Sequence, residues 1–329
     1  MNKQQRKVLV TGAAGFIGSH LVDVLLANGD FVVNLDNFNN FYDPQIKRDN
    51  IKEHLEHKNY QLIEGDLRDK NKLDEVFAYG PFDVVVHLAA MAGVRPSIEN
   101  PAYYTDVNVN GTQLLLDAAV KGNVKRFVFG SSSSVYGGRG GEQFLETDRV
   151  DRPLSPYAAT KVAGEQLCYV AHHTTGLPTI CLRFFNSFGP RQRPDLALPK
   201  FYRLVESGQP IEIYGDGSTK RDYTFVRDTV YGISQSMVVD FSGYEIINLG
   251  RGEPVRLMDM VHTIESVMNK KAKLVYKELH CADVPYTYAN IDKARRLLGY
   301  NPTISFADGV KEFVDWYKSV EDSRAASRV

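Results

Sequence analysis

Residues 8–21 read Val8-Leu9-Val10-Thr11-Gly12-Ala13-Ala14-Gly15-Phe16-Ile17-Gly18-Ser19-His20-Leu21. A short apolar run, a glycine-rich turn and an amphipathic helix follow one another in this stretch. The three glycines permit a tight turn and let backbone N–H groups at the helix N-terminus approach a pyrophosphate. The order of these features predicts the first strand, turn and helix of a dinucleotide-binding unit.

A second apolar run, residues 31–35, ends at Asp36. Its carboxylate follows the glycines by about 20 residues, where it can accept hydrogen bonds from an adenosine ribose. A 2′-phosphate would be repelled, and no arginine or lysine directly follows Asp36, so NAD is favoured over NADP. The strand–turn–helix context and the acid together make a purely structural glycine turn the weaker interpretation.

Apolar runs at 8–10, 31–35, 60–63, 83–88, 125–130 and 178–183 indicate buried strands, with helical periodicity between them. This alternation predicts an α/β fold with a doubly wound parallel sheet, a Rossmann domain over residues 1–186. After Asn186 the pattern changes to Pro- and Gly-rich loops with short elements. We expect residues 187–329 to form a smaller mixed α/β substrate lobe, interleaved with the sheet.

Residues 155–161 read Ser155-Pro156-Tyr157-Ala158-Ala159-Thr160-Lys161. Ser155 suits a helix N-cap and Pro156 the first helical position. Tyr157 and Lys161 are then four residues apart on one helix face. A nearby ammonium favours phenolate, so we expect Lys161 to lower the pKa of Tyr157 and make it a general base.

A run of four serines, residues 131–134, follows the apolar strand 127–130. Hydroxyl groups at the C-terminal end of a strand lie where open α/β sheets bind ligands. A plain serine-rich loop is the alternative interpretation.

Together these motifs resemble the extended short-chain dehydrogenase/reductase superfamily, specifically its NAD-dependent nucleotide-sugar epimerases. The resemblance covers nearly the whole chain and includes further motifs: residues 87–90, Asn108, 183–186, 189–195, 221–223 and 297–300. It implies a sugar-nucleotide 4-epimerase that removes a hydride from carbon 4, lets the 4-keto sugar turn over, and returns the hydride to the other face. Net redox is zero, so NAD should stay bound.

Residue roles follow from this resemblance. Ser132, Tyr157 and Lys161 are the expected catalytic residues. The expected cofactor-binding residues are Gly12, Gly15, Phe16, Ile17, Gly18, Asp36, Asn37, Asp66, Leu67, Leu88, Ala89, Ala90, Asn108, Tyr157, Lys161 and Phe184. The expected substrate-binding residues are Arg95, Ser132, Ser133, Ser134, Tyr157, Asn186, Arg193, Tyr214, Arg221 and Asp283.

The sugar is best matched by UDP-glucuronate, interconverting with UDP-galacturonate, because residues 189–195, 283–289 and 155–161 look most like UDP-glucuronate 4-epimerases. Asn186, where that group often has threonine, and the small Thr287 leave UDP-glucose and UDP-N-acetylglucosamine open. A UDP-glucuronate decarboxylase and a non-catalytic NAD-binding regulator are further alternatives. Dehydration is disfavoured, because 4,6-dehydratases carry an acid/base pair where this chain has Ser133 and Ser134.

Composition sets the remaining expectations. A net charge of −1 gives no basic field for nucleic acid. The three cysteines and eight histidines show no metal or disulfide spacing, and no stretch is long enough to span a bilayer. We expect a cytoplasmic protein that binds no metal, no nucleic acid and no membrane. The resemblance implies a homodimer through helices at about 100–121 and 155–173.

Overall fold

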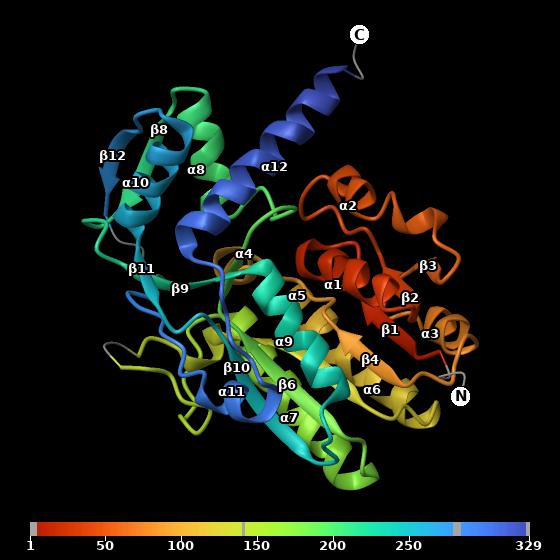
Figure 1. Cartoon of the computed structure of the whole chain (residues 1–329). Helices are drawn as coiled ribbons and strands as arrows, with labels where there is room; N and C mark the ends of the chain where they lie inside the picture. Colours follow the sequence, from red (N-terminus) through yellow and green to blue (C-terminus); the bar gives the residue numbers. More distant parts are fainter. Residues whose placement is uncertain (1–4, 140–141, 279–283, 327–329) are drawn as a thin grey trace.

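Seven parallel strands form the central sheet of the computed structural model, which describes residues 5–139, 142–278 and 284–326 (Figure 1). The strand order is β3-β2-β1-β4-β5-β6-β10. Their bounds are β1 (Lys7–Thr11), β2 (Phe31–Asp36), β3 (Tyr60–Glu64), β4 (Val84–His87), β5 (Phe127–Ser132), β6 (Thr179–Phe184) and β10 (Tyr244–Leu249). The order reverses between β1 and β4, so a ligand crevice is expected beyond the carboxyl ends of these two strands.

Helices cover both faces of this sheet. Successive β1 residues point to opposite faces of the sheet. Val8 and Val10 pack into the hydrophobic cluster on one face, and Leu9 packs into the hydrophobic cluster on the other face. Helices α1 (Phe16–Ala27) and α9 (Val226–Val238) pack together on the Val8 side. Helices α3 (Lys70–Phe77), α6 (Gly111–Lys121) and α7 (Pro156–Thr175) cover the other side. The predicted doubly wound α/β fold is confirmed.

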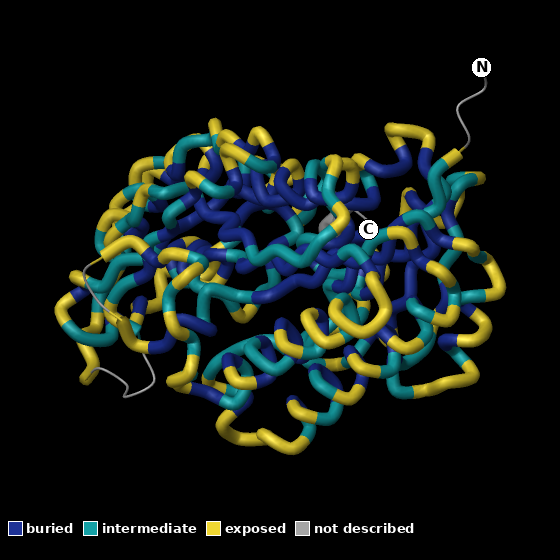
Figure 2. Tube along the Cα trace, turned by 90° about the horizontal axis from the view of Figure 1, so that it is seen from below, coloured by how far each residue is buried: buried dark blue, intermediate teal, exposed yellow. Residues whose placement is uncertain are grey.

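The strands are apolar over their whole length because both faces are covered. Val8, Leu9 and Val10 have no exposed surface, and Figure 2 shows the sheet as the buried layer beneath more exposed helices. All six runs predicted as strands form strands of this sheet.

The second half of the chain builds a smaller lobe beside the sheet (Figure 1). One three-stranded sheet joins β7 (Asn186–Phe188), β9 (Lys220–Phe225) and β11 (Pro254–Arg256), and a two-stranded sheet joins β8 (Pro210–Tyr214) and β12 (Lys273–Lys277). Helices α8 (Ala197–Glu206), α10 (Leu257–Met268) and α12 (Phe306–Ala326) complete it. Because β10 and α9 return to the main sheet, the two parts are interleaved.

The remaining described elements are short. They are α2 (Pro44–Asn50), η1 (His54–Glu56), α4 (Val94–Glu99), α5 (Pro101–Thr105), the π-helical turn η2 (Asp106–Asn110), η3 (Ser133–Tyr136) and α11 (Asp292–Leu298). Elements α5, η2 and α6 run on from one another, so the long helix expected at about 100–121 forms with one π-turn inside it. Among the helices described here, none is both long and apolar enough to cross a membrane.

Candidate active site

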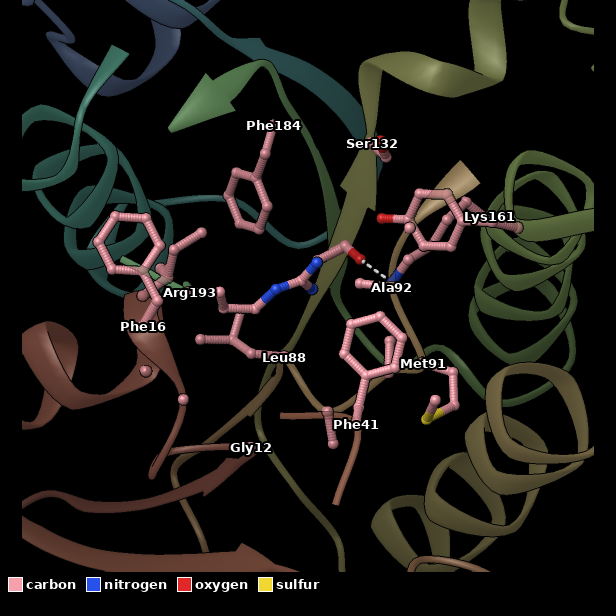
Figure 3. A pocket seen from close by; sticks show the side chains of 18 of the residues that line it. Gly12, Phe16, Phe41, Leu88, Met91, Ala92, Ser132, Lys161, Phe184 and Arg193 are labelled. Carbon is pink, nitrogen blue, oxygen red and sulfur yellow. Dashed lines mark hydrogen bonds between the residues drawn. The ribbon is translucent and has the colours of Figure 1, made fainter. Parts of the chain in front are cut away.

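A cavity of about 530 Å³ opens at the carboxyl ends of the central strands. Figure 3 shows Ser132 and Lys161 on one side of this cavity and Gly12 and Phe16 on the opposite side, with Arg193 directed into the space between them. The cavity therefore brings the glycine-rich turn and the serine–tyrosine–lysine motif together, although they are far apart in the sequence.

The glycine-rich turn is built for close backbone approach. Gly12 has φ +72°, and a Cβ there would lie 2.7 Å from the Ala89 nitrogen. A Cβ on Gly18 would lie 2.5 Å from the Gly12 carbonyl oxygen. Gly15 caps α1 without any side-chain hydrogen bond, which leaves the N–H groups of the first turn to bind an anion. This cradle fits a dinucleotide pyrophosphate.

Asp36 ends β2 at the cavity wall, where its carboxylate is buried and accepts N–H groups of Ala14 at 3.1 Å and Phe38 at 2.9 Å. Burial raises the pKa of Asp36. Lys47 on α2 also lines this end of the cavity, and its Nζ donates to the Asn39 carbonyl at 2.9 Å. Sequence reasoning missed Lys47, because it looked for a cation only directly after Asp36.

The cavity is also lined, as predicted, by Asn37, Asp66 and Leu67. Asn37 Nδ2 donates to Asp66 Oδ2 at 3.0 Å, and Arg68 donates to both oxygens of Asp66 at 2.9 and 2.8 Å. The hydrogen bonds from Arg68 lower the pKa of Asp66 to about 2. Asp66 therefore stays an acceptor across the physiological pH range.

The wall between the two ends is the segment after β4. Leu88, Ala89 and Ala90 line the cavity as predicted, and the Ala89 N–H donates to the Thr11 hydroxyl at 3.3 Å. Asn108 does not line the cavity; it is buried in the π-turn behind Met91. Asn108 would therefore act on the cofactor through Met91 and not by direct contact.

The helix α7 begins as predicted, since the Ser155 hydroxyl accepts the Ala158 N–H at 3.1 Å and Pro156 is the first helical residue. Tyr157 in the first turn and Lys161 in the second both reach the cavity. The Lys161 ammonium donates to the Gly130 carbonyl at 2.7 Å, and burial lowers its pKa to about 8.

A short hydroxyl relay reaches Tyr157. Ser134 Oγ donates to Ser132 Oγ at 2.8 Å, so the Ser132 hydroxyl hydrogen is not used in that bond and can be directed toward Tyr157. Burial nevertheless raises the pKa of Tyr157, while the hydrogen bond with Ser132 and the charge of Arg193 oppose that rise. The expectation that Lys161 lowers this pKa was wrong for the protein alone: desolvation of the phenolate dominates.

The predicted substrate residues separate into two groups. Ser133, Asn186, Arg193 and Arg221 line the cavity together with Phe184. Arg193 is held by two hydrogen bonds to Asp195, at 3.0 and 2.7 Å, and lies 5.1 Å from the ring centre of Phe41. Sequence reasoning gave no role to Phe41 because an aromatic residue in a loop carries no motif.

Arg95 and Tyr214 form the second group. The Arg95 guanidinium lies 4.8 Å from the Tyr214 ring centre, and neither residue is in the cavity lining. The place of Tyr214 beside the nucleotide base stays a prediction. Asp283 lies outside the described residues. Among the described residues, no group of three or more His, Cys, Asp or Glu side chains could hold a metal ion.

Comparison with known proteins agrees with this geometry. Residues 9–313 match the family model described as GDP-mannose 4,6 dehydratase. The UDP-glucuronate 4-epimerase of Thermodesulfobacterium geofontis is 41% identical over 311 residues, covering 94% of this chain and 95% of that protein. The chain belongs to this family, as one of the NAD-dependent nucleotide-sugar epimerases of the extended short-chain dehydrogenase/reductase superfamily.

Two solved epimerase structures share the fold closely. The UDP-glucuronic acid 4-epimerase of Bacillus cereus, in complex with UDP-glucuronic acid and NAD, has a TM-score of 0.89 at 36% identity, covering 95% of this chain and 99% of that one. The UDP-glucose 4-epimerase of Thermotoga maritima has a TM-score of 0.88 at 29% identity, covering 96% and 99%. Like these epimerases, the chain is an NAD-dependent isomerase, and its glycine cradle and Asp36 suit that cofactor.

Proposed function

We propose that this protein is a UDP-sugar 4-epimerase that interconverts UDP-glucuronate and UDP-galacturonate with tightly bound NAD. The observation that carries the proposal is the convergence of Ser132, Tyr157 and Lys161 with the dinucleotide cradle in one cavity. The 41% identity to a UDP-glucuronate 4-epimerase supports the choice of sugar.

The cofactor-binding residues fit NAD in three places. The turn at Gly12 and the first N–H groups of α1 would hold the pyrophosphate. Asp36 would accept hydrogen bonds from the adenosine ribose, and Lys161 would donate to the nicotinamide ribose. When bound, NAD⁺ accepts the hydride from carbon 4 of the sugar and later returns it.

Tyr157 is the proposed general base. The neighbouring Ser132 hydroxyl lowers the pKa of Tyr157, so Ser132 would stabilise the phenolate that takes the proton of the 4-hydroxyl. Burial opposes this ionisation, and a positive charge beside the ring would offset part of that cost. Lys161 and the cationic nicotinamide would supply that charge.

The sugar carboxylate would be held by neutral donors. Burying a carboxylate without hydrogen bonds is costly, and Ser133 and Asn186 both face the cavity. Ser134 donates to Ser132 here, so its hydroxyl hydrogen serves the catalytic relay. Arg193 and Arg221 would bind the diphosphate or ribose, since guanidinium groups suit phosphate oxygens.

Dehydration does not fit this site, although the matching family model is described by a 4,6-dehydratase. The positions that would carry an acid/base pair hold Ser133 and Ser134, whose hydroxyls do not titrate at neutral pH.

We also propose that the protein is a cytoplasmic homodimer in which α6 and α7 pair with their symmetry mates. Tyr169 and Val170 of α7 are 48% and 54% exposed, an apolar surface that an isologous contact would cover. Light scattering at micromolar concentration should give twice the chain mass; a monomer mass would contradict the proposal. We further propose that residues 1–186 form the cofactor domain and that residues 187–329 form the sugar-nucleotide lobe.

The proposed substrate is tested by incubating the purified protein separately with UDP-glucuronate, UDP-glucose and UDP-N-acetylglucosamine and identifying products by NMR. We expect UDP-galacturonate from the first and much slower change in the others. Rapid conversion of either neutral sugar with no change in UDP-glucuronate would contradict the proposed substrate. It would favour the neutral sugars that Asn186 leaves open.

A further inference from the structure

Besides Tyr157 and Lys161, the active-site helix α7 carries a buried polar side chain that the proposed reaction does not use. Glu165 has no exposed surface and follows Lys161 by four residues on α7, just as Lys161 follows Tyr157. This spacing keeps the three side chains on one stripe of the helix. Glu165 is therefore part of the helix face that builds the active site.

Two of these side chains bind neighbouring residues at the end of β5. The Lys161 ammonium donates to the Gly130 carbonyl at 2.7 Å, while Tyr157 lies near enough to Ser132 for that hydroxyl to influence its pKa. Glu165 binds the residue between them, because its Oε1 accepts the Ser131 hydroxyl at 2.5 Å. The end of β5, which delivers the catalytic serine, is thus fixed against α7 at two successive residues, Gly130 and Ser131.

A buried arginine compensates the charge of Glu165. Arg183 of β6 donates from Nε and Nη2 to the two carboxylate oxygens at 2.9 and 2.7 Å, and both side chains are buried. Its guanidinium lies 4.7 Å from the ring centre of Tyr136. Without this partner, an ionised carboxylate at this depth would be strongly unfavourable.

We infer that Glu165 is a positioning residue of the active site, which sets the end of β5 against Tyr157 through Ser131 and keeps the Lys161 ammonium charged. This inference rests on the proposed function, because it assigns Glu165 a task in the same reaction. The carboxylate touches neither cofactor nor sugar, so it acts through its neighbours.

Few charged side chains other than that of Glu165 are buried near the Lys161 ammonium. Burial lowers the pKa of Lys161 to about 8, and its interactions with Cys168, with the Glu165 carboxylate and with Cys181 oppose that fall. Besides the half-buried Tyr157, the buried titratable groups on the described strands and helices packed around Lys161 are His87 (β4), Tyr104 (α5), Tyr136 (η3), Glu165 and Cys168 (α7), and Cys181 and Arg183 (β6).

Most of these groups are neutral near pH 7. Burial lowers the pKa of His87 to about 3, and burial raises the pKa of Tyr104 to about 12. Burial also raises the pKa of Tyr136 and of Cys181. The charged residues of α4 and α6 are exposed on those helices: Arg95, Glu99, Asp117 and Lys121. The buried carboxylate and the buried guanidinium of this described set are those of Glu165 and Arg183.

The test is the pH dependence of kcat for the cofactor-loaded enzyme, using whichever UDP-sugar the wild type converts. Loss of the Lys161 proton should define the alkaline limb. Glu165→Gln removes the carboxylate charge, so we expect this limb to move to lower pH by about one unit. Glu75→Gln, which removes a half-exposed carboxylate paired with Lys72 on α3, is the matched control and should leave the limb in place.

Ser131→Ala tests the positioning part separately. It keeps the Glu165 charge but removes the hydrogen bond to β5, so kcat should fall about tenfold while the alkaline limb stays at the wild-type pH. Cofactor content and thermal unfolding of each variant are measured alongside. If Glu165→Gln does not fold, Glu165→Gln/Arg183→Met removes both buried charges; the alkaline limb should still move to lower pH, but by less than one unit, because loss of the Arg183 charge offsets part of the effect.

Two results would overturn the inference. One is a folded, NAD-loaded Glu165 variant whose alkaline limb coincides with that of the wild type. The other is wild-type kcat in Ser131→Ala. Failure of the wild-type protein to convert UDP-glucuronate would instead count against the proposed function, and the pH limb would then be read with the sugar that it does convert.

Discussion

Asn108 clamps the backbone of Met91 from both sides: its Oδ1 accepts the Met91 N–H at 2.7 Å and its Nδ2 donates to the Met91 carbonyl at 2.9 Å. The same Nδ2 group donates to the Thr160 hydroxyl at 3.0 Å, on the helix that carries Tyr157. One buried amide in the π-turn thus joins the cofactor wall after β4 to the catalytic helix.

Asn108→Ala should therefore loosen the cofactor wall without removing any group from the cavity. Three buried hydrogen bonds are lost, which should lower the free energy of unfolding by about 2–3 kcal/mol. We expect less NAD to be released per chain when the purified variant is denatured. Asn110→Ala, at an exposed position of the same π-turn, is the control and should retain the wild-type NAD content.

Tyr157→Phe should abolish most turnover and leave NAD bound. The variant keeps the ring that packs at the cavity but lacks the oxygen that takes the proton, so kcat should fall by about 10²–10⁴-fold or more. Dinucleotide content and kcat are measured on the same sample. Near wild-type kcat in this variant would eliminate Tyr157 as the base, whereas Tyr169→Phe, exposed on the same helix, should be active.

Ser134→Ala should change the pH dependence more than the affinity. Without the Ser134 hydroxyl, the Ser132 oxygen no longer accepts its hydrogen bond from Ser134. The Ser132 hydroxyl should then be a weaker donor toward Tyr157. The pKa of Tyr157, already raised by burial, should rise further. Because the phenolate forms only above that pKa, the acid limb of kcat should move to higher pH, by about half a unit. An unchanged acid limb would show that the relay does not extend to Ser134.

Ser133→Ala should instead alter sugar preference. If Ser133 donates to the sugar carboxylate, its loss should raise KM for UDP-glucuronate by about tenfold and change KM for a neutral UDP-hexose little. Asn186→Thr should be tolerated, because threonine is also a neutral donor. Equal losses for charged and neutral sugars in Ser133→Ala would remove Ser133 from carboxylate recognition.

Much of this fold follows from local sequence signals. The apolar strands are buried on both faces, so they read as continuous runs, and the Ser155–Pro156 start of α7 is set by capping chemistry within four residues. The positions of Gly12 and Asp36 were equally clear, because each role depends on the residues next to it.

The features that could not be predicted depend on distant parts of the chain. Lys47 reaches the Asp36 end of the cavity from a separate short helix, and Asn108 acts through a loop that follows another strand. The predicted direction of the Tyr157 pKa shift was wrong because burial, which is a property of the whole fold, outweighs the hydrogen bond with Ser132 and the charge of Arg193. The contact of Tyr214 with Arg95, whose guanidinium lies 4.8 Å from the ring centre, also joins residues far apart in the sequence.

The central claim is that a hydride leaves carbon 4 of UDP-glucuronate and returns to the same atom without leaving the active site. It is tested most directly with UDP-glucuronate carrying deuterium at carbon 4, incubated with purified protein in ordinary water and no added NAD. NMR and mass spectrometry should show UDP-galacturonate that keeps the deuterium at carbon 4. Product that has exchanged the label for solvent hydrogen, or no product while a neutral UDP-sugar is epimerised, would contradict the claim.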